Sequence, residues 1–121
     1  MSLIQNYVQG EWVSGEGSEI AFHHAITGAA IGETSSEGLD YGAILNYGRT
    51  VGGPALRKMT FQERGRMLKA LALHLNGIKE TFYTLSAATG ATRVDSWIDI
   101  EGGIGNLFAN ASLRRQFPDL P

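Results

Sequence analysis

Few residues of this chain combine the side-chain type and the spacing that chemistry requires. His23 and His24 are adjacent and could suggest a metal site. Neighbouring residues of a strand point to opposite faces, however, and no third ligand is spaced nearby. His74 lies near the apolar face of an expected helix, where a place on the helix flank is favoured over the role of a general base. We therefore predict no metal site in this chain.

Three carboxylates lie close together towards the end of the chain, at Asp95, Asp99 and Glu101. A cap in the first helical turn for Asp95, and solvent exposure or a salt bridge for the other two, are favoured over general acid and base roles. The sequence has no phosphate-binding glycine loop, no nucleophile elbow and no zinc-protease histidine pair. We predict no catalytic and no cofactor-binding residue within this chain.

Glycines interrupt the last expected helix at Gly102, Gly103 and Gly105. Each glycine costs about 1 kcal/mol relative to alanine inside a helix, so the three together cost about 3 kcal/mol. Close approach of a neighbouring backbone is the favoured reason for them, and the empty volume of a ligand passage is the alternative. The run is not a dinucleotide fingerprint, because it lies inside a helix instead of at a turn from strand to helix.

The elements that must position these residues change in character near Thr34. Before it, short extended runs are interrupted by turn residues and predict two hairpins, one with a positive φ at Gly10 and one turning at residues 26–28. Such hairpins are too small to fold alone and must pack on the later part of the chain. We expect residues 1–34 to form a β-hairpin arm.

Residues 35–121 are expected to form a helical segment of three to four helices. The first helix is predicted to begin at Ser36, with Glu37 and Asp40 in its first turn, and to be weakened or ended at residues 52–54. Its expected apolar stripe consists of Leu39, Ala43, Tyr47 and Val51.

Capping signals place the remaining helices. The residues Thr60 to Glu63 form a capping box, and the helix after it is expected to bend at Asn76-Gly77 and to stop at Thr89-Gly90. A second box, Thr92 to Asp95, opens a last helix that runs to about Arg115. The apolar face of the second helix is predicted to consist of Met67, Leu68, Leu71, Leu75 and Ile78.

Length and composition limit the class of protein. A chain of 121 residues is one compact unit or part of something larger. It contains no cysteine, which excludes disulfide frameworks and a thiol nucleophile within the chain and fits a reducing cytosol. The longest uncharged run, residues 20–32, is too short to span a membrane. We expect a cytoplasmic protein without a membrane span.

Charge argues against nucleic acid as a partner. The net charge is −2, whereas a nucleic-acid binder needs a dense basic face. All ten lysines and arginines lie from Arg49 onward, together with six of the twelve acids, so this part carries a net charge of +4. A solvated helix face is the favoured reason, and an anionic ligand such as a CoA phosphate is the alternative.

The order of these elements resembles the opening part of the aldehyde dehydrogenase superfamily. Residues 6–13, with the sequence Asn-Tyr-Val-Gln-Gly-Glu-Trp-Val, resemble its first hairpin, and residues 26–33 resemble its second. Residues 60–68 resemble its capped second helix, and Thr89-Gly90 resembles the pair that closes the next one. The likeness covers the whole chain, and its specificity lies in the ordered set.

Further segments resemble the bifunctional, PaaZ-type branch of phenylacetate degradation, which joins a dehydrogenase to a ring-opening hydratase. They are residues 23–26, 34–40, 54–57 and above all 95–105. A related semialdehyde dehydrogenase of benzoyl-CoA breakdown shares part of this pattern. At residues 23–28 the sequence His-His-Ala-Ile-Thr-Gly departs from the Asn-Pro-Ala-Thr-Gly ending usual in the superfamily, and we interpret this as identity of the branch.

The resemblance implies a mainly α segment with a β-hairpin arm, the first part of the α/β NAD(P)-binding domain. It implies NAD(P)-dependent oxidation of a CoA-linked semialdehyde to the acid, in which a cysteine thiolate attacks the aldehyde and a glutamate-activated water releases the product. Those residues, and the binding site for NAD or NADP, come later in the family's chain. The chain is thus expected to be an inactive N-terminal fragment.

The resemblance also assigns a role to the last helix, which forms one wall of the substrate tunnel in this fold. Ile98 and Gly102 are the positions that face the tunnel, and Gly102, helped by Gly103, would widen it for a CoA-bearing substrate. Homo-oligomers built on dimers are expected as well. The alternative is an autonomous helical interaction module without enzymatic activity; the end of the chain in a proline-bearing loop favours the first interpretation.

Overall fold

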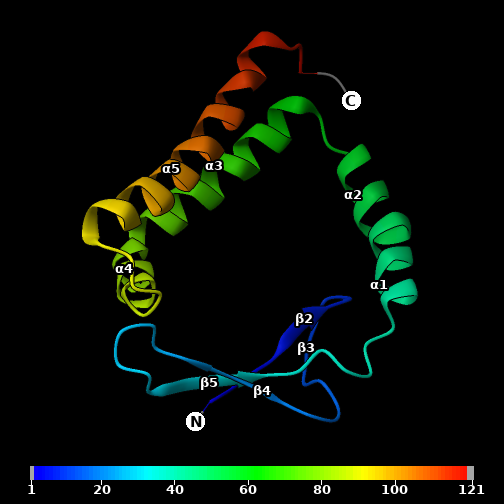
Figure 1. Cartoon of the computed structure of the whole chain (residues 1–121). Coiled ribbons are helices and arrows are strands. Elements are labelled where there is room, and N and C mark those ends of the chain that lie inside the picture. The colour runs from blue at the N-terminus through cyan, green and yellow to red at the C-terminus, as the bar shows by residue number, and fades with distance from the viewer. Residues whose placement is uncertain (1, 120–121) are drawn as a thin grey trace. The chain divides into compact units, whose positions relative to one another are not determined.

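The computed structural model describes residues 2–119, which divide after Pro54 into two compact units. Among these residues, the strands and the first helix lie in the first unit, a short helix spans the boundary, and the regular structure of the second unit is helical (Figure 1). The chain is therefore mainly α-helical with small β-sheets, as expected.

The first predicted hairpin is present. Strands β2 (Asn6–Val8) and β3 (Glu11–Val13) pair antiparallel. The turn between them has φ of 53° at Gln9 and 83° at Gly10, and two consecutive positive values are typical of a type I′ turn, whose twist matches that of the strands. The expectation of a positive φ at Gly10 is confirmed.

The second predicted hairpin belongs to a three-stranded sheet. Strands β4 (Ile20–His23) and β5 (Ala30–Thr34) pair antiparallel around a turn in which Gly28 has φ of 72°. Strand β1 (Leu3–Ile4) pairs in parallel with β5, which gives the order β1-β5-β4. We did not predict β1, because two residues are too few to show an alternating pattern.

The first helix, α1 (Tyr41–Tyr47), begins later than predicted. Its N-cap is Asp40, whose Oδ1 accepts a 2.9 Å hydrogen bond from the backbone N–H of Ala43. The predicted start at Ser36 is therefore wrong, and Glu37 lies outside the helix instead of in its first turn. The capping chemistry was expected, but it operates one turn further along the chain.

A crossing of two segments explains why the helix starts late. The backbone N–H of Glu16 donates a 2.9 Å hydrogen bond to the carbonyl of Glu37, and the buried Ser35 hydroxyl donates to the carbonyl of Glu16 at 2.8 Å. Gly38 then turns with φ of 78°. The Glu37 carbonyl, which would accept a hydrogen bond within a helix beginning at Ser36, is thus already occupied, and Gly38 does not have helical φ.

The Gly52-Gly53-Pro54 sequence weakens the helix without ending it. The chain passes from α1 through a π-helical turn, η1 (Gly48–Gly52), into α2 (Gly53–Arg57). Pro54 is in the first turn of α2, where its missing N–H would have no helical partner in any case. The prediction was that this sequence weakens or ends the helix. The structure confirms the first alternative, because the helical path is distorted but continues.

In the second unit, the capping box of α3 (Phe61–Gly77) is confirmed in both of its hydrogen bonds. Ile78, with φ of −112° and ψ of 12°, comes directly after the predicted bend and separates α3 from α4 (Lys79–Ala87). Gly90, with φ of 85°, lies just beyond the end of α4, as the Thr-Gly pair predicted.

The last helix, α5 (Arg93–Ser112), continues into a 3-10 turn, η2 (Leu113–Gln116), close to the predicted end. Thr92 caps α5 by accepting from the backbone N–H of Asp95. The carboxylate of Asp95 in turn accepts from the Thr92 hydroxyl at 2.7 Å, so the second box differs from the reciprocal form seen at α3.

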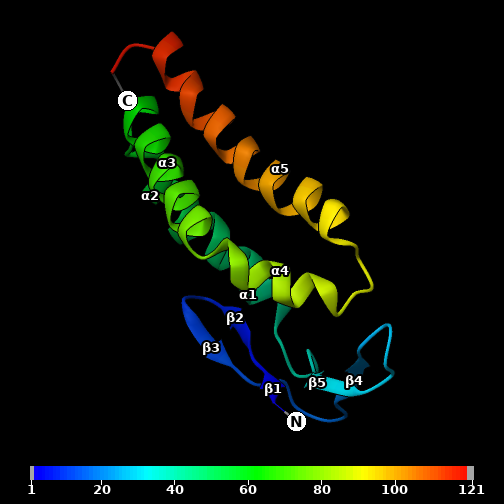
Figure 2. The same ribbon diagram turned by 90° about the vertical axis from the view of Figure 1, so that its left-hand side faces the viewer.

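Helices α3 and α5 lie side by side and run in opposite directions, with α4 joining them (Figures 1 and 2). The core between these elements is thin: its fully or nearly buried apolar residues are Ala72, Tyr83, Ile104 and Ala111. Part of the predicted apolar face of α3 remains outside it, because Met67, Leu71 and Ile78 are each more than 40% exposed. No helix in the described part of the chain is both long enough and apolar enough to cross a bilayer.

Candidate functional site

Ile98 and Gly102 lie one helical turn apart on the same face of α5. The side chain of Ile98 is 60% exposed, and a Cβ atom added to Gly102 would have no atom of the described structure within 4 Å beyond its own helix and chain neighbours. Within the second unit this face is therefore open, and it can line a passage if another element covers it.

The glycine run of α5 has no close neighbour that would explain it. Gly103 and Gly105, like Gly102, have open space where a Cβ would lie. Close approach of a neighbouring backbone was the favoured explanation of the run. Among the residues that the structure describes, no backbone approaches these glycines in this way. Ile104, between these glycines, is buried and anchors this stretch of α5 to the unit.

A polar network joins α4 to α5 next to this face. Lys79 Nζ donates a 2.7 Å hydrogen bond to Glu101 Oε1, and the Tyr83 hydroxyl donates to the same oxygen at 3.3 Å. The side chains of the Lys79–Glu101 ion pair are 31% and 27% exposed. We call these three residues the α4–α5 clamp.

Each group of the clamp has a shifted pKa. The hydrogen bond from Lys79 holds the pKa of Glu101 below its ordinary value, and the hydrogen bond to Glu101 raises the pKa of Lys79. Burial, aided by the negative charge of Glu101, raises the pKa of Tyr83. The clamp is therefore fully charged at neutral pH on its Lys and Glu, and the phenol keeps its proton.

A second layer of contacts surrounds the clamp. The Arg93 guanidinium lies 3.6 Å from the centre of the Tyr83 ring and pairs with Glu80 at 3.2 Å. Together these groups border a pocket of about 360 Å³ that also exposes the Trp97 ring. The clamp was not predicted from the sequence; the four-residue spacing of Lys79 and Tyr83 places both on one face of α4, but only the packing of α5 supplies Glu101.

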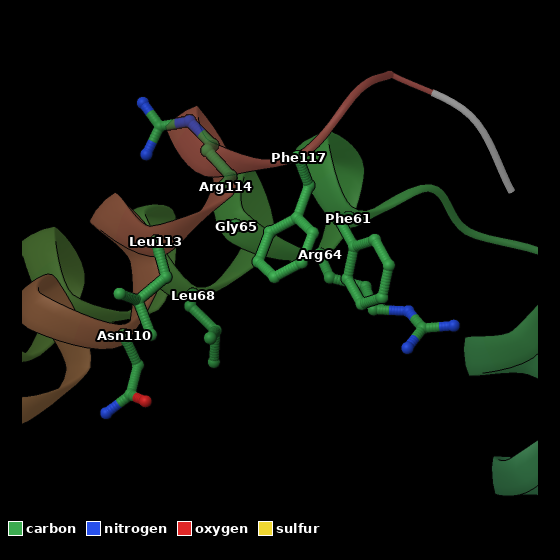
Figure 3. Close-up of a pocket in the computed structure, with 8 residues that line it drawn as sticks. All are labelled: Phe61, Arg64, Gly65, Leu68, Asn110, Leu113, Arg114 and Phe117. Atoms are coloured by element: carbon green, nitrogen blue, oxygen red, sulfur yellow. The ribbon is translucent and has the colours of Figure 1, made fainter.

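The opposite end of α3 and α5 forms an apolar pocket of about 280 Å³ (Figure 3). The rings of Phe61 and Phe117 lie 4.7 Å apart there, and Leu68 and Leu113 also line the pocket. The Gln62 amide donates to the carbonyl of Phe117 at 3.0 Å and fixes this end of the unit. The residues that line this apolar pocket include no nucleophile, no carboxylate and no histidine, so we assign no catalytic role to the pocket.

The remaining candidates have structural roles. His24 Nδ1 accepts from the backbone N–H of Ile26 at 3.2 Å and so supports the second hairpin turn. His74 is exposed on α3, Asp99 is exposed on α5 and Glu101 forms a salt bridge, as favoured from the sequence. Between residues 2 and 119, no group of three or more acidic or histidine side chains could hold a metal ion.

The comparisons with known proteins bear on this arrangement. Over 102 residues, or 84% of its length, the chain is 36% identical to a 3,4-dehydroadipyl-CoA semialdehyde dehydrogenase from Aromatoleum evansii. The chain is related to the aldehyde dehydrogenases. The resemblance stated from the sequence is thereby confirmed. The chain spans about a fifth of the length of this curated relative, 20%. No protein-family model matches the chain.

The described part of this dehydrogenase-related chain does not fit a nicotinamide cofactor. The Gly102–Gly105 run lies inside α5, whereas a dinucleotide is held by glycines at a turn from strand to helix. The sequence also contains no cysteine that could serve as a nucleophile.

Proposed function

We propose that the chain is the N-terminal part of a cytoplasmic, NAD(P)-dependent aldehyde dehydrogenase that oxidises a CoA-linked semialdehyde in the degradation of aromatic compounds such as phenylacetate. The observation that carries this proposal is the 36% identity to a CoA-semialdehyde dehydrogenase over 84% of the chain. NAD or NADP is bound by other parts of the α/β cofactor domain. The isolated chain is inactive, because it has no cysteine nucleophile.

Exposed apolar side chains support the interpretation that this segment packs against further protein. The second unit has no large apolar side chain that is fully buried among its described residues. Its surface instead carries an unusual share of large apolar groups, and such surfaces mark interfaces. They include Met67, Leu71, Leu73, Ile78, Leu85, Val94, Trp97 and Ile98. The rest of the cofactor domain, and the partner subunits of a homo-oligomer, would cover them.

Within this enzyme, Ile98 and Gly102 line one wall of the substrate tunnel. The support is their common face on α5, the exposure of Ile98 and the open space at Gly102. The absence of a side chain at position 102 leaves room for the long, CoA-bearing substrate. This role would account for a glycine at a position inside a helix, where it costs about 1 kcal/mol of stability relative to alanine.

The test is Gly102→Leu in the longer dehydrogenase that carries this chain. We expect kcat/KM for the CoA-linked semialdehyde to fall by about tenfold or more, since a side chain in a fitted passage changes selectivity by this order, while a short aldehyde keeps its rate. Gly77→Leu is the matched control, because its Cβ also meets open space but lies on α3. Equal losses for both substrates would assign Gly102 to packing instead.

A further inference from the structure

We propose that the α4–α5 clamp of Lys79, Tyr83 and Glu101 is a positioning device that fixes how α5 presents Ile98 and Gly102. The proposal rests on the tunnel function given above and deepens it, because it identifies the residues that set the orientation of the tunnel wall. None of the three residues is proposed to touch the substrate.

The glycine run makes such a device necessary. Paired glycines are common sites of helix bending, and Gly102, Gly103 and Gly105 have no neighbour that would hold them. The helix α5 is anchored by two buried residues, at Ser96 through a 2.8 Å hydrogen bond to Ser86 and at Ile104 through burial. Gly102 and Gly103 lie between these two anchors, where a further attachment would restrain the helix.

Glu101 provides this attachment at the required position. It immediately precedes Gly102 and comes three residues after Ile98, so its side chain lies beside the proposed tunnel face on the same turn. Both clamp donors converge on one carboxylate oxygen, Oε1, from residues one turn apart on α4. Two donors from one rigid helix fix the rotation of α5 about its axis better than a single contact does.

The bend and the surrounding contacts hold the donors in place. Lys79 is the first residue of α4 and comes directly after the bend at Ile78. Tyr83 is 6% exposed and the Arg93 guanidinium lies over its ring, which leaves the hydroxyl little freedom. The clamp ion pair is about one-third exposed or less, so solvent screens it less than the Arg93–Glu80 pair, whose side chains are 66% and 72% exposed.

Hydrogen exchange in the 121-residue chain tests the attachment. We expect Glu101→Gln and Lys79→Met each to raise the exchange rate of the amides at 102–105 by about fivefold, because loss of a charge-assisted hydrogen bond favours local opening. The matched control is Glu80→Gln, which breaks the neighbouring exposed pair and should change these rates by less than about twofold. The double charge reversal Lys79→Glu with Glu101→Lys should restore protection.

Three results would overturn the attachment: unchanged exchange in both single variants, equal increases with Glu80→Gln, or a reversed pair no better protected than the singles. Tyr83→Phe keeps the ring under Arg93 and removes only the hydroxyl. It should give a smaller rise confined to the same amides, and this milder variant decides the question if a charge variant does not fold.

Kinetics in the longer dehydrogenase tests the positioning role. We expect Lys79→Met to raise KM for the CoA-linked semialdehyde about fivefold with kcat little changed, to leave a short aldehyde unaffected, and to be rescued by the reversed pair. If exchange rises but KM for the CoA-linked semialdehyde does not, the clamp is structural only and the proposal fails. If the longer protein oxidises no aldehyde at all, the proposed function has failed, and the exchange data still show whether the attachment exists.

Discussion

Gly65 of α3 lies directly against Arg114 of the 3-10 turn η2. A Cβ atom at Gly65 would stand 2.6 Å from the Cδ and 2.8 Å from the Cβ of Arg114, and 2.9 Å from the backbone oxygen of Ala111. This glycine therefore allows two segments to approach closely, whereas the glycines of α5 border open space. Gly65 and the glycines of α5 are therefore present for different physical reasons, and substitutions at these positions should have opposite effects on stability.

We expect Gly65→Ala to lower the free energy of unfolding of the second unit by about 1–3 kcal/mol, because the new methyl group overlaps backbone and a Cβ. Gly103→Ala is the control and should raise it by about 1 kcal/mol through helix propensity alone. Urea denaturation followed by circular dichroism measures both. A stabilising Gly65→Ala would show that α3 and η2 do not pack as closely as described.

The variant Thr60→Ala removes the α3 cap and should lower the free energy of unfolding by about 1 kcal/mol. The Thr60 hydroxyl accepts from the backbone N–H of Glu63 at 3.1 Å and donates to Asp119 at 2.7 Å, so both bonds are lost. Thr60→Ser retains the hydroxyl and should be nearly neutral when the variants are compared by thermal denaturation. Equal losses in the two variants would mean that the methyl group, not the cap, stabilises this site.

In the first unit, Gly28→Ala should destabilise the second hairpin by about 1–2 kcal/mol, because an alanine is strained at φ of 72°. Gly48→Ala is matched in size and environment, since neither Cβ would meet an atom within 4 Å, but position 48 has helical φ. It should be neutral or stabilising. Exchange rates of the hairpin amides report the difference, and similar behaviour of the two variants would contradict the assigned turn.

The clamp predicts two pH limits of stability. The folded state lowers the pKa of Glu101, so its stabilising contribution is present above the ordinary carboxyl pKa and is lost as pH falls through the lowered value. The folded state raises the pKa of Lys79 above 10.5 and that of Tyr83 above 10.0. Their contributions are present below these ordinary values and are lost as pH rises through the raised ones.

Urea midpoints measured from neutral pH into the acid range check the acid limit. Glu101→Gln should have a lower midpoint at neutral pH and a flatter acid profile than the original chain, since it has no carboxylate to protonate. The titratable groups that hydrogen-bond to Glu101 are Lys79 and Tyr83, whose pKa values are both raised, so neither titrates in the acid range. Parallel profiles for the two proteins would assign the acid limit to other carboxylates.

The uncovered apolar surface predicts self-association of the 121-residue chain. Leu71 and Leu85 are 45% and 65% exposed, and burying such groups between copies is favourable. Sedimentation should show mass rising with concentration, and the variant Leu71→Lys with Leu85→Lys should remain smaller with unchanged helicity. A monomer with full helicity at every concentration would favour the autonomous interaction module.

Local sequence signals determined much of the fold. Gly10, the capping box at Thr60 and the bend after Gly77 depend on interactions within a few residues, so their consequences can be read from neighbours in the chain. The family resemblance depends on the same ordered local signals, and it is confirmed by the identity to the semialdehyde dehydrogenase. Ile98 and Gly102 came from that resemblance, and their tunnel role remains a prediction.

Other features depend on residues far apart in the chain. Asp40 caps α1 in place of Ser36 because Glu16 and Ser35 make hydrogen bonds across the unit, and β1 exists because β5 offers it an edge. Local propensity does not predict such contacts, because the two partner residues are brought together by folding of the chain and not by their spacing in the sequence.

The sequence by itself determined that the chain is a mainly helical segment with a β arm, related to the aldehyde dehydrogenases and without a cysteine nucleophile. Only the tertiary structure decided that Glu101 meets Lys79 and Tyr83, and that the glycines of α5 border open space while Gly65 is packed. The reason is geometric: a carboxylate and an ammonium 22 positions apart become partners only when two packed helices bring them within hydrogen-bond distance.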